Sequence, residues 1–137
     1  MKVSITNGEL LDRISILELK KLNMKNAANL AAVEKEFLEL NRLVVEVFSQ
    51  NDSTLQVLFL ELARINGKLW ELENLVRKPE VSNKEFISYS KTIFKYNGIR
   101  NDLKNDINLV TGSDNLHPKS ISSLINISKS IAATKSI

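Results

Sequence analysis

Two pairs of oppositely charged residues are the best placed in this sequence to do chemistry. Glu9 and Asp12 stand three positions apart at the start of one predicted helix, and Arg100 and Lys104 stand four apart on another. Each spacing puts both members of a pair on one helix face, so two facing helices can bring the carboxylates and the cations together. We favour a structural ion network that orients the two helices over a catalytic or ligand-binding site.

The remaining chemical repertoire is narrow. The 137-residue chain has no cysteine and a single histidine, His117, which excludes thiolate chemistry and cysteine-ligated zinc and argues against histidine-based sites. Glu36 with Glu39, and Glu71 with Asn74, approach the E-x-x-E and E-x-x-D spacings with which all-α nucleotide pyrophosphohydrolases hold Mg²⁺. Asn74 replaces the final carboxylate, however, and Glu36 and Glu39 lie off the apolar seam. We therefore expect neither a metal site nor a cofactor.

The charge of the chain is unevenly distributed. The net charge of +3 comes from Lys119, Lys129 and Lys135, which leaves residues 1–114 neutral, so we do not expect nucleic acid as a partner. No apolar run reaches the roughly 20 residues of a membrane span, and residues 1–10 lack the apolar segment of a signal peptide. These features, with the absence of cysteine, predict a soluble cytoplasmic protein.

The strongest structural signal is an apolar seam in residues 53–78. Its members recur at alternating steps of three and four, which is typical of an α-helix packed against neighbouring helices. They are Leu55, Leu58, Leu62, Ile65, Leu69, Leu72 and Val76. Gly67 interrupts this helix at a cost of about 1 kcal/mol relative to alanine, so we expect another backbone to pass close to it.

A second helix is predicted from residue 27 to about residue 48, with its apolar side chains at the same spacing. They are Leu30, Val33, Phe37, Leu40, Val44 and Val47. A short polar turn at residues 49–52 follows, and Ser53 with Gln56 has the spacing of a capping box. We therefore predict that these two helices form an antiparallel hairpin, with Leu40 and Leu62 on facing seams.

Residues 10–22 are predicted to form a shorter helix whose apolar residues surround its axis. Thr6 and Glu9 stand in capping-box spacing before it, and Leu10 and Ile14 share one face whereas Ile16 points almost opposite. A helix of this kind lies either at the centre of the bundle or partly in a subunit interface. The preceding residues 2–5 alternate polar and apolar, as in a short strand or an extended arm.

The helix predicted at residues 83–110 changes character along its length. Ser82 with Glu85 has capping-box spacing, and Gly112 is expected to cap the other end. The inner face begins with Phe86 and then continues as a polar line. The line consists of Asn97, Arg100, Lys104 and Asn108. It faces either a cavity in the bundle or solvent, and we favour solvent because polar stripes on long helices are usually at the surface.

The sequence thus predicts an all-α fold, a helical bundle of four main helices that includes a long antiparallel helical hairpin. Residues 1–113 are assigned to one bundle domain. Residues 114–137 are a tail rich in serine and lysine, in which a short amphipathic helix starting near Pro118 is an alternative to an irregular chain.

Four stretches carry a resemblance to a known family. They are GELLDRISILELK at residues 8–20, LWELE at 69–73, Phe86–Ile87, and NGIRNDLKNDINLVTGS at 97–113. The chain resembles the domain of unknown function 6165 family of small bacterial and phage proteins, from whose pattern it departs at Asn74 and Gly98. The resemblance implies a shared fold and no established activity, although some relatives stand beside surface-polysaccharide or glycosyltransferase functions. Its motifs contribute the ligand-binding candidates Glu9, Asp12, Glu18, Trp70, Glu73, Asn97, Arg100, Lys104 and Asn108.

Two classes of function are open at this point. We favour a non-enzymatic assembly or adaptor protein that acts through protein–protein contacts, because apolar seams are abundant and no catalytic set is recognisable. The excess of apolar surface also predicts a homo-oligomer, most simply a homodimer, in the cytoplasm of a bacterium or of a phage-infected cell. The alternative is an enzyme or small-ligand binder that uses the carboxylate, arginine and lysine cluster. Its ligand would be a nucleotide or nucleotide sugar linked to surface-polysaccharide synthesis.

Overall fold

The structure, a computed structural model, describes residues 5–51 and 53–113. They form four α-helices: α1 (Asn7–Asn23), α2 (Ala27–Ser49), α3 (Ser53–Val76) and α4 (Asn83–Thr111). No strand occurs in this part of the chain, so the prediction of an all-α bundle of four main helices is confirmed. The predicted arm or strand, apart from Ile5, and the predicted tail helix lie outside the described residues. No described helix is both long and apolar enough to cross a lipid bilayer.

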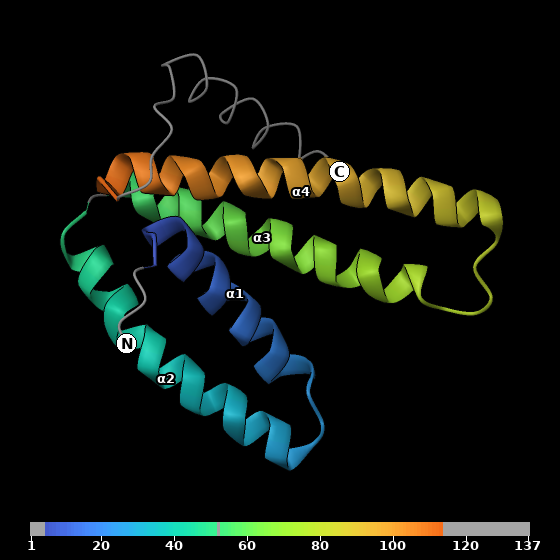
Figure 1. The fold of residues 1–137 in the computed structure, drawn as a ribbon, viewed down its shortest axis with the longest axis horizontal. Helices are drawn as coiled ribbons and strands as arrows, with labels where there is room; N and C mark the ends of the chain where they lie inside the picture. Colours follow the sequence, from blue (N-terminus) through green and yellow to red (C-terminus); the bar gives the residue numbers. More distant parts are fainter. Residues whose placement is uncertain (1–4, 52, 114–137) are drawn as a thin grey trace.

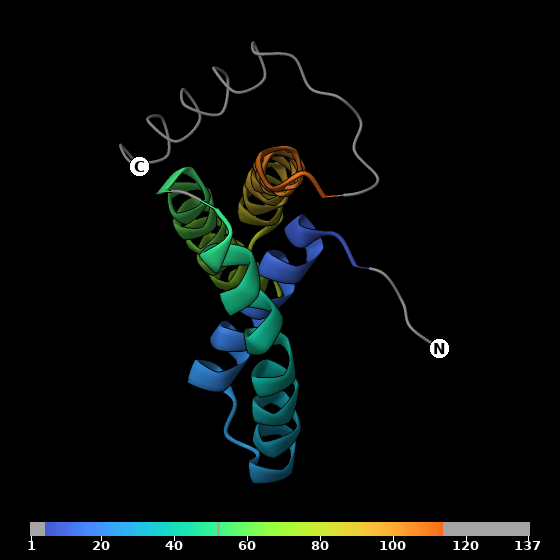
Figure 2. The ribbon, with the colours of Figure 1, turned by 90° about the vertical axis from the view of Figure 1, so that its left-hand side faces the viewer.

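The helices are arranged as two hairpins (Figure 1). α3 and α4 run antiparallel and side by side, and they form the long hairpin. α1 and α2 form a shorter hairpin, which diverges from the long one towards its loop (Figure 2). α1 contacts all three other helices, so it is the central helix of the bundle, one of the two places that its all-round apolar surface predicted.

The predicted hairpin between residues 27–48 and 53–78 is wrong, because α2 and α3 diverge from the turn that joins them (Figure 1). Near that turn the rings of Phe48 and Phe59 meet edge to face, with their centroids 5.5 Å apart. Further along, α2 packs mainly on α1 and α3 mainly on α4. Apolar spacing shows which face of a helix is buried, but it does not show which helix covers that face. Leu62 lies inside the common core and Leu40 only borders it.

The hydrophobic core lies where α1 packs against the α3/α4 hairpin. Its most deeply buried apolar side chains come from these three helices and are Leu11, Leu55, Leu62, Ile65, Leu103 and Ile107. The seam predicted in residues 53–78 is confirmed from Leu55 to Leu69, and Leu72 borders the core. α2 contributes less, since Val33 and Val44 are its only buried residues.

The helix ends follow the sequence signals closely. Ser82 and Glu85 form the complete capping box predicted for α4, and Gly112 caps its other end in the left-handed conformation at φ 64°. Thr6 accepts a hydrogen bond from the Glu9 backbone N–H, as predicted, but the Glu9 carboxylate makes an ion pair elsewhere. Ser53 is the first residue inside α3 rather than its cap, and the cap position, residue 52, is not described.

The close backbone approach predicted at Gly67 is not found among the described residues. Apart from the local backbone of α3 itself, none of their atoms lies within 4 Å of the place where a Cβ on Gly67 would be, and α3 continues through this residue without a break. Gly8 is instead the glycine against which another backbone packs: a Cβ there would collide with the carbonyl oxygen of Lys104. A glycine in the middle of a predicted helix stands out in the sequence. A glycine at the start of a helix, such as Gly8, does not indicate by itself that another backbone packs against it.

The end of the long hairpin extends beyond α1 and α2 (Figure 1). None of residues 70–95, which we call the hairpin tip, is fully buried. Phe86 was predicted on the inner face but is 51 % exposed, and its neighbours Ile87 and Phe94 are 54 % and 83 % exposed. The apolar face of α4 therefore runs past the helices that could have covered it.

Candidate functional site

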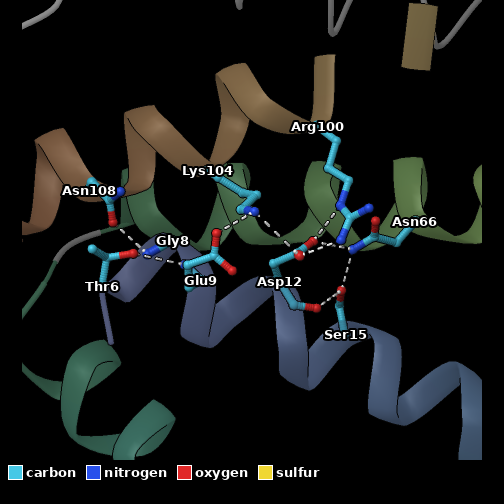
Figure 3. Close-up of polar contacts among 9 residues, drawn as sticks. All are labelled: Thr6, Gly8, Glu9, Asp12, Ser15, Asn66, Arg100, Lys104 and Asn108. Carbon is cyan, nitrogen blue, oxygen red and sulfur yellow. Dashed lines mark hydrogen bonds and ion pairs between the residues drawn. The ribbon is translucent and has the colours of Figure 1, made fainter. Parts of the chain in front are cut away.

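A bidentate ion pair joins the two charge pairs singled out in the sequence (Figure 3). Arg100 on α4 donates from Nε to Asp12 Oδ1 at 2.9 Å and from Nη2 to Asp12 Oδ2 at 2.6 Å. The Asp12 side chain is only 5 % exposed, and that of Arg100 is 27 % exposed. A parallel pair of charge-assisted hydrogen bonds fixes both side chains and sets the orientation of α1 against α4.

Two further polar residues, Asn66 and Ser15, form hydrogen bonds with Asp12. Asn66 Nδ2 on α3 donates to Asp12 Oδ1 at 2.9 Å and to Ser15 Oγ at 2.6 Å. Ser15 in turn donates its hydroxyl hydrogen to the backbone carbonyl of Asp12 at 2.9 Å. Both residues are buried, so α1, α3 and α4 are joined by one buried polar network.

Lys104 adds a second ion pair one turn further along α4. Its Nζ lies 2.6 Å from Glu9 Oε1 and 3.8 Å from Asp12 Oδ2 (Figure 3). The Lys104 side chain is 16 % exposed, whereas that of Glu9 is 55 % exposed. Lys104 thus links a buried carboxylate to one at the surface.

The start of α1 is attached to the end of α4 through backbone groups. Gly8 N–H donates to Asn108 Oδ1 at 2.6 Å, and Asn7 N–H donates to Ser113 Oγ at 2.9 Å. Asn7 also donates from Nδ2 to the Thr111 hydroxyl at 2.9 Å. The two backbone bonds satisfy N–H groups that the first turn of a helix leaves without partners, so residues at the end of α4 supplement the Thr6 cap of α1.

The electrostatics of the network favour the charged forms. Burial raises the pKa of Asp12, but hydrogen bonds from Arg100 and Asn66, together with the charges of Arg100 and Lys104, outweigh it and hold this pKa below its usual value. The hydrogen bond to Asp12 raises the pKa of the Arg100 guanidinium despite its burial, and the charges of Asp12 and Glu9 act in the same direction. Asp12 is therefore a fixed carboxylate rather than a general acid or base working near neutral pH.

The favoured interpretation of the polar line on residues 97–108 as solvated is wrong. Asn108 is 7 % exposed, and Arg100 and Lys104 face α1, so this line is the side of α4 that carries the helix contact. Ser15 and Asn66 were not among the residues predicted from the sequence. The only signal for Asn66 is an amide beside Ile65 in an apolar seam, and Ser15 stands among the apolar residues of α1 without any special spacing.

Four of the candidate residues line one cavity of about 300 Å³, although they come from distant stretches. Trp70 and Glu73 reach it from α3, and Asn97 and Arg100 reach it from α4. Its other lining residues are Ile16, Leu19, Asn66, Leu69, Asn74 and Arg77. We call it the Trp70 cavity.

A neighbouring hollow of about 290 Å³ is lined by Glu9, Asp12 and Arg100 among others, so Arg100 borders both spaces. Glu18 is not brought to either place, because it is exposed and lies beside Lys21 and Leu22. In the described part of the chain, no three acidic or histidine residues are arranged to hold a metal ion. Glu36, which was compared with the Mg²⁺-binding E-x-x-E spacing above, makes an ion pair with Arg13 instead.

The comparisons with known proteins place the chain in a family without giving it an activity. No curated protein and no solved structure matches the chain. A family match covers residues 1–136, which includes every stretch that carried the resemblance and extends through almost all of the tail. The chain therefore belongs to the family of unknown function DUF6165.

Proposed function

We propose that this protein is a non-enzymatic assembly protein that acts through protein–protein contacts, and that its hairpin tip pairs with the tip of a second copy. One observation carries the proposal: the apolar row formed by Phe86, Ile87 and Phe94 on α4 has no covering helix among the described residues. A two-helix hairpin draws most of its stability from packing, so an uncovered apolar row at its end favours a partner.

The charged candidates support an assembly role because they are already paired with one another. Asp12 accepts from Arg100 and Asn66, and Lys104 makes an ion pair with Glu9. A catalytic base or nucleophile needs a reacting group within hydrogen-bond reach and a suitable pKa, whereas the pKa of Asp12 is held low by its partners. The network is suited to holding three helices in a fixed arrangement, from which the tip extends.

The position of the apolar row explains why a second copy is a fitting partner. Phe86 and Ser90 lie on the line along α4 that continues through Lys104, and α1 covers this line further along the helix. Beyond the reach of α1, Phe86 on this line is 51 % exposed, so a helix from another molecule can take the place there that α1 occupies further along α4. The exposed surface there forms a shallow hollow of about 420 Å³.

The sequence around Ser90 is arranged for a two-fold contact. Phe86 and Phe94 stand four residues before and after Ser90, on the same face of α4. If two α4 helices cross antiparallel at Ser90, Phe86 of each copy meets Phe94 of the other. Ser90 is small enough to permit a close helix crossing, so the two pairs of rings can pack on either side of it.

Light scattering of the full chain at micromolar concentration tests the proposal. We expect a mass of twice the 15.5 kDa of one chain for the parent protein and 15.5 kDa for Phe94→Glu. Phe94 is 83 % exposed, so the substitution does not disturb the fold of one chain. Leu38→Glu on α2, where Leu38 is 67 % exposed, is the matched control and retains the parent's mass. A parent mass of 15.5 kDa overturns the proposal.

Binding of a small ligand is the second candidate function. It is supported by the Trp70 cavity, which is lined by aromatic, amide and guanidinium groups. This cavity shares no lining residue with the shallow hollow on the tip, so the two functions are compatible and can be tested separately.

A further inference from the structure

The Trp70 cavity lies between α1 and the long hairpin, in the region where α1 diverges from α3 and α4 (Figure 1). Ile16 and Leu19 of α1 form apolar lining on one side, and Leu69 and Trp70 of α3 form apolar lining on the other. Its volume of about 300 Å³ is at the lower end of the range for small-molecule sites. An indole flanked by aliphatic side chains is suited to a planar ring, which stacks on the indole.

Asn66 provides a hydrogen-bond acceptor for the cavity. A carboxylate can only accept, so the atom facing Asp12 is Nδ2, and Ser15 Oγ accepts from the same nitrogen because its own hydrogen goes to a carbonyl. The amide orientation is thereby fixed, and Figure 3 shows the oxygen turned away from Ser15. Asn66 is 3 % exposed, lines the cavity, and accepts no hydrogen bond through Oδ1 from any described residue.

Arg100 provides a donor for the same cavity. Its Nε and Nη2 are both used by Asp12, which leaves Nη1 without a hydrogen bond to any described residue. Arg100 and Asn66 both line the cavity, and their positions are fixed by the network. Arg100 Nη1 can therefore donate to a ligand there, and Asn66 Oδ1 can accept from it. A nucleobase has a complementary edge, with a ring or carbonyl acceptor beside an N–H donor.

The mouth of the cavity carries a further cation. Arg77 lines it and is 74 % exposed, and its Nη2 lies 3.6 Å from the Glu73 carboxylate. An exposed arginine is suited to a phosphate, which accepts from a guanidinium through two parallel hydrogen bonds, and its exposed contact with Glu73 is weak enough to be exchanged for one. Asn74 and Asn97 line the same cavity and offer amide groups to a ribose.

We propose that the Trp70 cavity binds a nucleoside monophosphate. The base stacks on Trp70, its hydrogen-bonding edge meets Asn66 Oδ1 and Arg100 Nη1, and the phosphate meets Arg77 at the mouth. The proposal names the ligand class for the second candidate function and rests on it, and it does not depend on pairing of the hairpin tip.

The sequence supplies its own probe for this site, because Trp70 is the only tryptophan in the chain. The four common ribonucleoside monophosphates, their nucleosides and inorganic phosphate are titrated into the full-length protein while tryptophan fluorescence is followed, with correction for absorption by the bases. We expect at least one nucleotide to quench Trp70 saturably with a Kd tighter than about 1 mM and to raise the melting temperature. Inorganic phosphate alone leaves the fluorescence unchanged.

Arg77→Ala and its neighbour Lys78→Ala form a matched pair, since both remove one exposed cation and only Arg77 lines the cavity. Arg77→Ala weakens binding of the nucleotide about tenfold and leaves binding of the nucleoside unchanged, whereas Lys78→Ala changes neither. Absence of quenching by all four nucleotides, or equal effects of the two variants, overturns the proposal. Light scattering on the same samples measures dimerisation through the tip. A negative result for nucleotide binding and a negative result for dimerisation can therefore be told apart.

Discussion

Arg100 and Asp12 lie 88 positions apart in the sequence, yet they form a bidentate, largely buried ion pair. Their contact fixes the orientation of α1 relative to α4. It joins the last helix to the first, and Asn66 adds the third helix through the same carboxylate. Single substitutions can measure how much this ion pair contributes to the free energy of unfolding.

Arg100→Ala is expected to lower the free energy of unfolding by about 3 kcal/mol, because it leaves the buried Asp12 carboxylate without its main partner. Arg13→Ala is the matched control: its ion pair with Glu36 is at the surface and costs less than about 1 kcal/mol to lose. Urea denaturation of both variants measures the difference. If Arg100→Ala unfolds at the same urea concentration as Arg13→Ala, the network does not fix the helices.

Gly8→Ala is expected to destabilise the fold by about 2 kcal/mol, because the added Cβ collides with the Lys104 carbonyl and lies 2.9 Å from Asn108 Oδ1. Gly67→Ala makes the same chemical change in open space inside a helix, so it stabilises by up to about 1 kcal/mol. Thermal unfolding of the two variants thus shifts in opposite directions. A Gly8→Ala protein that melts at or above the parent's temperature contradicts the close packing of α1 on α4.

The acid dependence of stability should contain a contribution from Asp12. Its pKa in the folded protein is below the usual carboxyl value, so the folded state binds this proton less readily than the unfolded state. The stabilisation is complete above the ordinary aspartate pKa of about 3.9 and is lost as pH falls through the folded-state pKa. Unfolding free energies of the parent and of Asp12→Asn therefore converge in acid.

A difference between parent and Asp12→Asn that stays unchanged from about pH 6 to about pH 3 would falsify the assignment of this contribution to Asp12.

Phe86→Glu should weaken the proposed tip contact at least about tenfold, because it places a carboxylate against Phe94 of the second copy at two symmetric places. Lys84→Glu also introduces a glutamate at an exposed position of α4, but away from the face of Ser90, and it leaves dimerisation unchanged. Sedimentation at several concentrations gives the dissociation constants of the parent and of both variants, and equal weakening by the two substitutions contradicts the geometry.

Local structure was largely predictable from the sequence. The alternating seam from Leu55 to Leu69, the capping box of Ser82 and the left-handed Gly112 all depend on residues close in the chain. The pairing of helices was not predictable in the same way, because the seams of α2 and α3 have the same period and either could have covered the other.

The candidate site was predictable only where residues close in the chain indicated it. Opposite charges at helical spacing on α1 and α4 indicated the contact of Asp12 with Arg100, which the structure contains. Ser15 and Asn66 were missed because a serine in an apolar helix and an amide in a seam indicate a polar network only when three helices are seen together. The burial of Asn108 likewise depends on the backbone of Gly8, 100 positions away.

The attachment of α1 to the end of α4 has a consequence for how the chain is made. α1 leaves the ribosome first, but the arginine that pairs with its buried carboxylate and the residues that accept from its first N–H groups are synthesised 88 to 106 residues later. At about 5–20 residues per second, α1 waits several seconds with its apolar faces incompletely covered. The α1/α2 hairpin can form locally in that interval and α3 can pack on α1, but the polar network closes only as the final turns of α4 emerge. A chain stalled before Arg100 would therefore hold the Asp12 carboxylate without its guanidinium partner.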